Sequence, residues 1–121
     1  MFLTLNHQKL DLYQASQKFV VEVYKLSNAL PAAEKFNMVT QIRRAALSVH
    51  LNIAEGSSIK SEQERKRYYE ISRGSLIEID AALDIAKELN YLELIEIEEL
   101  GRLMITCFKI LSVMKDPRSK H

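Results

Sequence analysis

Apolar side chains recur three and four residues apart along almost the whole chain, which is the spacing of one face of an α-helix. Only three glycines and two prolines interrupt this pattern, so the helices must be long and their connections short. An amphipathic helix needs other elements to cover its apolar face. The pattern therefore constrains the chain to an all-α bundle.

Four helical segments can be delimited, and they predict an antiparallel, up-down four-helix bundle that forms one domain over residues 1–121. We expect the helices at about 8–26, 33–55, 61–89 and 93–115. The first helix should carry two adjacent apolar rows that form one broad face: Leu10, Tyr13, Gln17, Val20 and Tyr24 beside Leu12, Ser16, Phe19, Val23 and Leu26. The rows expected on the other three helices are Val39, Ile42, Ala46, Val49 and Ile53; Tyr68, Ser72, Ser75, Leu76, Ile79, Leu83 and Ala86; and Ile97, Leu100, Met104, Cys107, Leu111 and Met114.

Helix boundaries follow from capping and turn residues. Pro31 is expected to end the first helix, and the run from Gly56 to Ser58 the second. Ser61 and Glu64 have the spacing of a capping box at the start of the third helix. Asn90 can adopt the left-handed conformation that ends it.

The second predicted helix is apolar on nearly every side, since Phe36, Leu47 and Leu51 lie outside its core row. A helix in a four-helix monomer normally keeps one polar face toward water. The surplus of apolar side chains therefore suggests contacts between subunits.

Charge is segregated although the net charge is only +1. Residues 76–101 contain one lysine and eight acids, which predicts an acidic end where the third helix turns into the fourth. The opposite end should gather the bases Lys60, Arg65, Lys66, Arg67, Lys109, Lys115, Arg118 and Lys120. This basic end could bind the phosphates of nucleic acid, dock against another subunit, or form an ordinary solvated surface.

Arg43 and Arg44 lie in the middle of the apolar second helix, where an unpaired charge would be expensive. One interpretation pairs them with an acid such as Glu55, Glu70 or Glu78. The other makes them phosphate ligands.

The run around Gly74 also has two interpretations, because it could permit close approach of another backbone or line a ligand pocket.

No catalytic or metal-binding pattern is present in the sequence. The three histidines form no His-x-x-x-His pair, and no Glu-x-x-His, phosphate-loop, dinucleotide or nucleophile-elbow motif occurs. We expect His50 to be hydrogen-bonded to a neighbouring polar group and Cys107 to pack in the core. We therefore expect the protein to have no enzymatic activity and to bind no cofactor or metal.

Four segments are similar to a known family: KLDLY at 9–13, QIRRAALSV at 41–49, NIAEGS at 52–57 and YEISRGSLIE at 69–78. They resemble the signatures of the four-helix bundle proteins encoded in intervening sequences of bacterial 23S ribosomal RNA genes. The resemblance implies a ring of subunits, often a pentamer. A related bundle, the accessory protein of diversity-generating retroelements, binds nucleic acid and a reverse transcriptase. The motif positions carried over are Arg43, Arg44, Asn52, Glu55, Gly56, Ser72, Gly74, Ser75 and Glu78.

These observations lead to one principal hypothesis and one alternative. The principal hypothesis is a cytoplasmic, ring-forming scaffold, expected to be a homopentamer, that contacts RNA or DNA phosphates through Lys60, Arg65, Lys66 and Arg67. Arg43 and Arg44 are further candidates for that contact. We expect the other motif positions to serve mostly fold and assembly. The alternative is an adaptor that binds a protein partner and no nucleic acid. No apolar run is long enough to cross a membrane.

Overall fold

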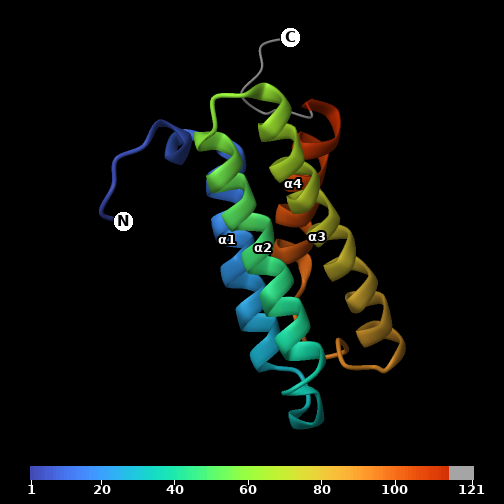
Figure 1. Cartoon of the computed structure of the whole chain (residues 1–121). Helices are drawn as coiled ribbons and strands as arrows, with labels where there is room; N and C mark the ends of the chain where they lie inside the picture. The colour runs from blue at the N-terminus through green and yellow to red at the C-terminus, as the bar shows by residue number, and fades with distance from the viewer. Residues whose placement is uncertain (115–121) are drawn as a thin grey trace.

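Four α-helices dominate the part of the chain that the structure describes. The computed structural model covers the backbone of residues 1–114 and the side chains of residues 1–112, with no strand among them. The helices are α1 (Asp11–Asn28), α2 (Met38–Ser58), α3 (Glu62–Glu88) and α4 (Glu98–Met114). Two short 3-10 helices, η1 (Asn6–Lys9) and η2 (Ala32–Glu34), precede α1 and α2. Consecutive helices run in opposite directions (Figure 1), and the predicted all-α bundle is confirmed.

Each helix packs against two others, in the cyclic order α1, α2, α3, α4. The contact between α2 and α3 is the most extensive, and that between α3 and α4 is the smallest. The edge formed by α1 and α2 therefore lies opposite the edge formed by α3 and α4. Surfaces on the α1–α2 edge and surfaces on the α3–α4 edge are therefore far apart in a single chain.

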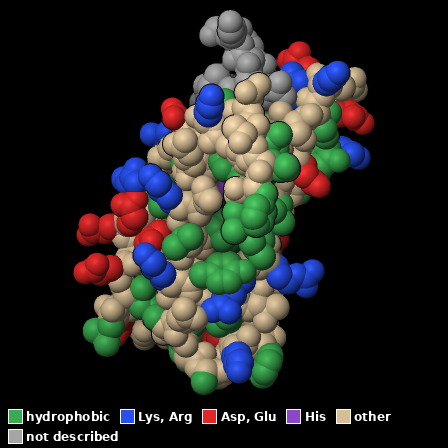
Figure 2. Space-filling view, turned by 90° about the vertical axis from the view of Figure 1, so that its left-hand side faces the viewer, with side chains coloured by type: hydrophobic (Ala, Val, Ile, Leu, Met, Phe, Trp, Pro, Cys, Tyr) green, Lys and Arg blue, Asp and Glu red, His purple; other side chains and the backbone are tan. Residues whose placement is uncertain are grey.

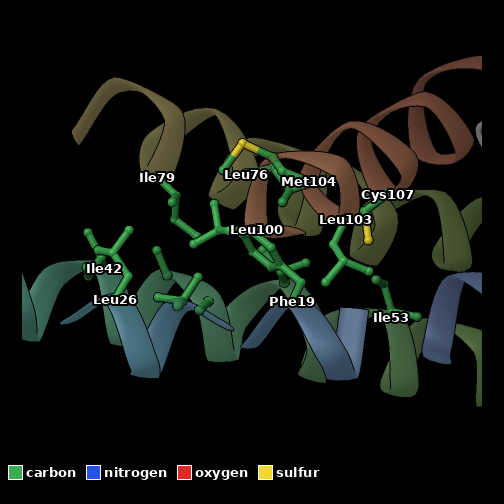
Figure 3. Close-up of a cluster of buried hydrophobic side chains, with 14 of the residues drawn as sticks. Phe19, Leu26, Ile42, Ile53, Leu76, Ile79, Leu100, Leu103, Met104 and Cys107 are labelled. Atoms are coloured by element: carbon green, nitrogen blue, oxygen red, sulfur yellow. The ribbon is translucent and has the colours of Figure 1, made fainter. Parts of the chain in front are cut away.

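The core is a continuous cluster to which all four helices contribute (Figure 3). Of the two rows predicted on the first helix, the one from Leu12 to Leu26 is buried throughout, whereas the one from Leu10 to Tyr24 is only partly buried and its Gln17 is exposed. The row predicted on the second helix is buried throughout. On α4 the row is buried from Leu100 to Leu111, while Ile97 precedes the helix and stays partly exposed. The side chain of Met114 lies outside the described ones. On α3 the prediction placed Tyr68 in the core, but the buried ring is that of Tyr69.

Several predicted boundaries need correction. α1 begins at Asp11 rather than near residue 8, because Leu10 is extended with φ −69° and ψ 138°. α2 begins at Met38, after the separate turn of η2, and the run from Gly56 to Ser58 continues the helix instead of ending it. α4 begins at Glu98 rather than near residue 93, and its predicted end at 115 lies outside the described residues.

The boundaries of α3 agree with the prediction to within one residue. The hydroxyl of Ser61 accepts a hydrogen bond from the backbone N–H of Glu64, at 3.4 Å, as an N-cap residue does. Asn90 has a φ of 63°, so it follows the helix in the expected left-handed conformation.

The close approach of α2 and α3 occurs at Gly56. A Cβ atom there would lie 2.8 Å from Tyr68 Cβ and 3.2 Å from Tyr69 Cε1, so no larger residue fits without a shift. A Cβ atom at Gly74 would meet nothing within 4 Å. The prediction that Gly74 permits a close backbone contact is therefore wrong for the single chain.

Candidate nucleic-acid interface

The connection between α2 and α3 forms the predicted basic end. Ile59 is extended after the last residue of α2, and Ser61 caps α3, so the connection is only three residues long. The guanidinium of Arg65 donates hydrogen bonds to the backbone carbonyls of Ile59, at 2.9 Å, and Lys60, at 2.6 Å. Arg65 therefore holds the turn together, which makes it a structural residue.

The other three bases at this turn are exposed. Lys60 and Lys66 project into solvent, and the guanidinium of Arg67 lies 5.4 Å from the ring centre of Tyr68. A short turn fixed by Arg65 thus presents three cations that could contact phosphate oxygens. Glu62 is exposed in the first turn of α3, so the surface there carries both signs of charge.

Among the described side chains, the end of α4 contacts α3 at Arg73, 11 residues after the first residue of α3, and not at the α2–α3 turn. Arg73 Nε donates a hydrogen bond to Ser112 Oγ at 2.8 Å, and its guanidinium lies 4.7 Å from the ring centre of Phe108. Lys109 is exposed on the same part of α4. The remaining bases predicted at this end, Lys115, Arg118 and Lys120, lie outside the described residues.

Arg43 crosses from α2 to the end of α1. Its Nε donates a hydrogen bond to Ser27 Oγ at 2.6 Å and its Nη2 donates one to Asn28 Oδ1 at 2.7 Å. The guanidinium also lies 4.8 Å from the ring centre of Tyr24. Arg43 is therefore satisfied by a hydroxyl, an amide and an aromatic ring, so its predicted pairing with a carboxylate is wrong.

Arg44 points outward from α2 and is exposed beside Leu47, Leu51 and Glu55 in a shallow surface hollow. It precedes the last residue of α2 by 14 positions, which corresponds to roughly 21 Å along the helix axis. The structure therefore does not bring Arg44 together with the bases of the α2–α3 turn.

Most of the remaining motif positions connect α2 with α3. Asn52 Nδ2 donates a hydrogen bond to the carbonyl oxygen of Ser48 at 2.8 Å, and Ser75 Oγ donates one to Ser48 Oγ at 2.8 Å. Ser72 Oγ donates one to the carbonyl oxygen of Val49 at 2.8 Å. Glu78 accepts a hydrogen bond from Gln41. These contacts support the expected role of the motif in the fold.

Two sets of hydrogen bonds in this region were not predicted from the sequence. Ser48 is the hydroxyl on which Asn52 and Ser75 converge. Ser57 and Tyr69 form a buried hydroxyl pair at 2.8 Å next to Gly56. A serine on an otherwise apolar helix is the signal that could have identified both contacts, since buried hydroxyls need partners.

His50 and Cys107 have the structural roles expected of them. His50 Nδ1 is hydrogen-bonded to Ser16 Oγ at 2.7 Å, and its pKa is lowered, first by burial and then by the nearby charge of His7. Burial raises the pKa of the Cys107 thiol to about 12. No group of three or more histidine, cysteine or acidic side chains in the described part of the chain is placed to hold a metal ion.

The other end of the bundle is acidic. Tyr91 lies in the connection between α3 and α4, and its hydroxyl donates a hydrogen bond to Glu34 Oε2 at 2.9 Å. Around this connection the exposed acids are Glu88, Glu93, Glu96, Glu98 and Glu99. The face seen in Figure 2 differs, because basic and acidic side chains are interspersed there around a central group of hydrophobic ones. Both signs of charge are thus also present along this side of the bundle.

The fold and its surface define a class of protein, a small all-α bundle with a basic turn at one end and an acidic connection at the other. None of the helices within residues 1–114 is long and apolar enough to span a membrane. The family model of the 23S rRNA-intervening sequence proteins matches residues 8–113, and the chain belongs to that family.

A solved structure agrees with this fold. It is the crystal structure of a protein of unknown function from the S23 ribosomal protein family of Bacteroides thetaiotaomicron VPI-5482. The TM-score is 0.76 at 22% sequence identity, over 86% of this chain and 94% of that one. No curated protein matches the sequence. The family rests on the match of its model to residues 8–113, and neither the family model nor the solved structure names an activity.

Proposed function

We propose that this protein is a non-enzymatic scaffold that assembles into a ring of identical subunits and contacts RNA or DNA through the α2–α3 turn. Lys60, Lys66 and Arg67 supply the contacts to phosphates, and Arg65 fixes the turn that presents them. Five subunits per ring is the number that the family resemblance implies. The exposed bases on a turn braced by Arg65 are the observation that carries the proposal.

The geometry favours phosphate contact over base readout. The basic side chains lie on a turn and on the first residues of α3. The edges of nucleobases in a duplex are instead read by protein elements that enter a groove. The N-terminus of α3 adds the positive end of the helix dipole. A ring would repeat this cationic turn once per subunit, and several weak contacts would then act together.

Self-association is supported by apolar side chains that the single chain leaves exposed. Leu47 and Leu51 lie one helical turn apart on the outer face of α2 and remain accessible to water. Phe2 and Leu3 are exposed ahead of η1. Exposed apolar side chains that lie side by side, as Leu47 and Leu51 do, are typical of protein–protein contacts.

A second candidate function is supported by the acidic end. Five exposed glutamates lie around the α3–α4 connection, and Glu99 among them is paired with Arg102. The other four form a surface that would attract a basic protein segment and repel nucleic acid. In this alternative the protein is an adaptor, and the α2–α3 turn contributes only solubility.

Binding measured by fluorescence anisotropy separates the two functions. We would titrate the protein into a structured RNA and a DNA duplex between about 50 and 200 mM salt. The test variant combines Lys60→Ala, Lys66→Ala and Arg67→Ala, and it leaves Arg65 in place to preserve the turn. Each duplex phosphate that the protein neutralises adds about 0.9 to the steepness of log K against log salt, so we expect the variant's slope to be shallower by roughly 3.

The matched control removes three exposed lysines elsewhere, with Lys9→Ala, Lys18→Ala and Lys87→Ala. Both variants change the net charge by the same amount, so only the place of the charge differs. The proposal requires the control to bind nearly as the unchanged protein does. Absence of binding at 50 mM salt, or an equal weakening in both variants, would contradict nucleic-acid contact and leave the adaptor.

A further inference from the structure

An apolar groove lies between α3 and α4, the two neighbouring helices with the smallest mutual contact. It has a volume of about 280 Å³ and is lined mainly by Leu76, Ile77, Ile105 and Phe108, with Asp80 and Lys109 also bordering it. Ile105 is 56% exposed although it lies in the middle of α4. The single chain therefore leaves this groove unfilled.

The N-terminal arm, residues 1–5, carries the most exposed apolar side chains that precede α1. Phe2 is 89% exposed and Leu3 is 66% exposed. The arm has no helical structure, in contrast to η1, which follows it. The bundle to which the arm is attached therefore does not bury these side chains.

The base of the arm is held against α1 and α2. The backbone N–H of Leu5 donates a hydrogen bond to Gln8 Oε1 at 3.0 Å. The ring of His7 lies 5.3 Å from that of Tyr13 in α1, which in turn lies 4.6 Å from the ring of His50 in α2. The arm thus begins at a fixed point on the α1–α2 edge, where Figure 1 shows it projecting from the bundle.

The arm is too short to reach the groove of its own chain. Five extended residues span at most about 17 Å. The groove lies on the opposite edge of the bundle, across two helix layers of about 10 Å each. Any contact between arm and groove must therefore join two different chains.

The groove has room for the side chains that the arm carries. A buried cavity of about 150 Å³ is large enough to bind benzene, and this groove has nearly twice that volume. Phe2 and Leu3 offer one aromatic and one branched aliphatic side chain. Their adjacent positions would let both enter one apolar site.

We propose that Phe2 and Leu3 of one subunit insert into the α3–α4 groove of the next subunit. This inference rests on the proposed self-association and names the contact responsible for it. The arm and the groove lie on opposite edges of one chain, so the contact is head-to-tail. A head-to-tail contact repeated around an axis closes into a ring, whereas a face-to-face contact would stop at a dimer.

Light scattering coupled to size-exclusion chromatography tests the role of the arm. The test variant is Phe2→Ser with Leu3→Ser, and the matched control is Phe36→Ser with Leu94→Ser. The control changes the same two residue types at side chains that are 87% and 99% exposed. We expect the arm variant to need at least a tenfold higher protein concentration for half-assembly, and the control to assemble normally.

Cross-linking tests which surfaces meet. Chains carrying Leu3→Cys are mixed with chains carrying Ile105→Cys under mild oxidation, and the buried Cys107 is left unchanged. We expect a disulfide-linked pair of one chain of each type. Ile85→Cys replaces Ile105→Cys in the control, because Ile85 is 55% exposed on α3 and does not line the groove.

Three outcomes would overturn the inference. A monomeric unchanged protein would overturn the proposed ring and the arm contact together. A ring that persists in the arm variant, with cross-linking no faster than in the Ile85→Cys control, would overturn the arm contact and leave the ring. A disulfide closed within single chains carrying both Leu3→Cys and Ile105→Cys would show that the arm fills its own groove.

Discussion

At the scale of single residues, two glycines inside helices face different surroundings. A Cβ atom on Gly56 would collide with Tyr68 Cβ at 2.8 Å, and that atom cannot move without its backbone. We predict that Gly56→Ala lowers the free energy of unfolding by about 1–3 kcal/mol through overpacking between α2 and α3. Urea denaturation followed by circular dichroism measures this change.

Gly74 provides the matched control for Gly56. A Cβ atom there meets nothing within 4 Å. Inside a helix, alanine is more stabilising than glycine by about 0.5–1 kcal/mol. Gly74→Ala is therefore expected to raise the free energy of unfolding. Equal decreases of stability in the two variants would contradict the close approach assigned to Gly56.

His50 couples stability to pH. Its pKa in the folded protein lies below the ordinary 6.5, so the unfolded chain binds more protons near that pH. We therefore predict that this contribution to the free energy of unfolding is full above about pH 6.5 and is lost as the pH falls toward the lowered pKa. Thermal unfolding midpoints recorded from about pH 7.5 to pH 5 provide the measurement.

Replacing His50 by a residue that does not titrate provides the control. Gln is polar and can still form a hydrogen bond with Ser16, so His50→Gln removes the proton-binding site with little change of volume. The pH dependence of the variant should be shallower than that of the unchanged protein. Identical slopes would show that His50 does not contribute to it.

At the scale of whole elements, Arg43 joins the end of α1 to the second turn of α2. It donates hydrogen bonds to Ser27 and Asn28 and stacks on Tyr24. We predict that Arg43→Ala destabilises the fold by about 2–3 kcal/mol, because the substitution removes two hydrogen bonds from a charged group together with a cation–π interaction. Chemical denaturation gives the difference directly.

The neighbouring Arg44 offers a control on the same helix. It is exposed on the outer face of α2, so Arg44→Ala should change the free energy of unfolding by no more than about 0.5 kcal/mol. The assignment of Arg43 to the fold would have to be abandoned if both substitutions had similar effects.

The elements that periodicity defines were predictable, and those that depend on neighbouring chain segments were not. The row from Val39 to Ile53 is buried because 3.6-residue spacing puts it on one face. On the first helix the same spacing allowed two adjacent rows, of which only the one from Leu12 to Leu26 is fully buried. Gly56 does not end α2, since the approach of α3 requires a residue without a side chain inside the helix. Periodicity also could not choose between the adjacent Tyr68 and Tyr69.

The candidate site was predictable in part. The sequence places Lys60, Lys66 and Arg67 together because they are close along the chain. It could not show that Arg65 binds the backbone of the turn, since this depends on the direction of the chain after α2. The partners of Arg43 come from another helix, and spacing along one helix does not reveal which helix is its neighbour.

At the scale of the whole molecule, the bundle has different surfaces at its two ends and at its two edges. A basic turn and an acidic connection occupy opposite ends, while the N-terminal arm and the apolar groove occupy opposite edges. Because the arm and the groove lie on opposite edges, subunits could assemble side by side in a ring. All basic turns would then lie on the same rim of that ring, where they could bind a single nucleic acid together.

Native mass spectrometry, with and without a short structured RNA, is the sharpest test of the proposed nucleic-acid-binding ring. We expect a species of about 70 kDa, five times the 14.0 kDa of one chain, which gains the mass of the RNA when the RNA is added at low salt. A species of 14.0 kDa that neither assembles nor retains RNA would contradict this proposal.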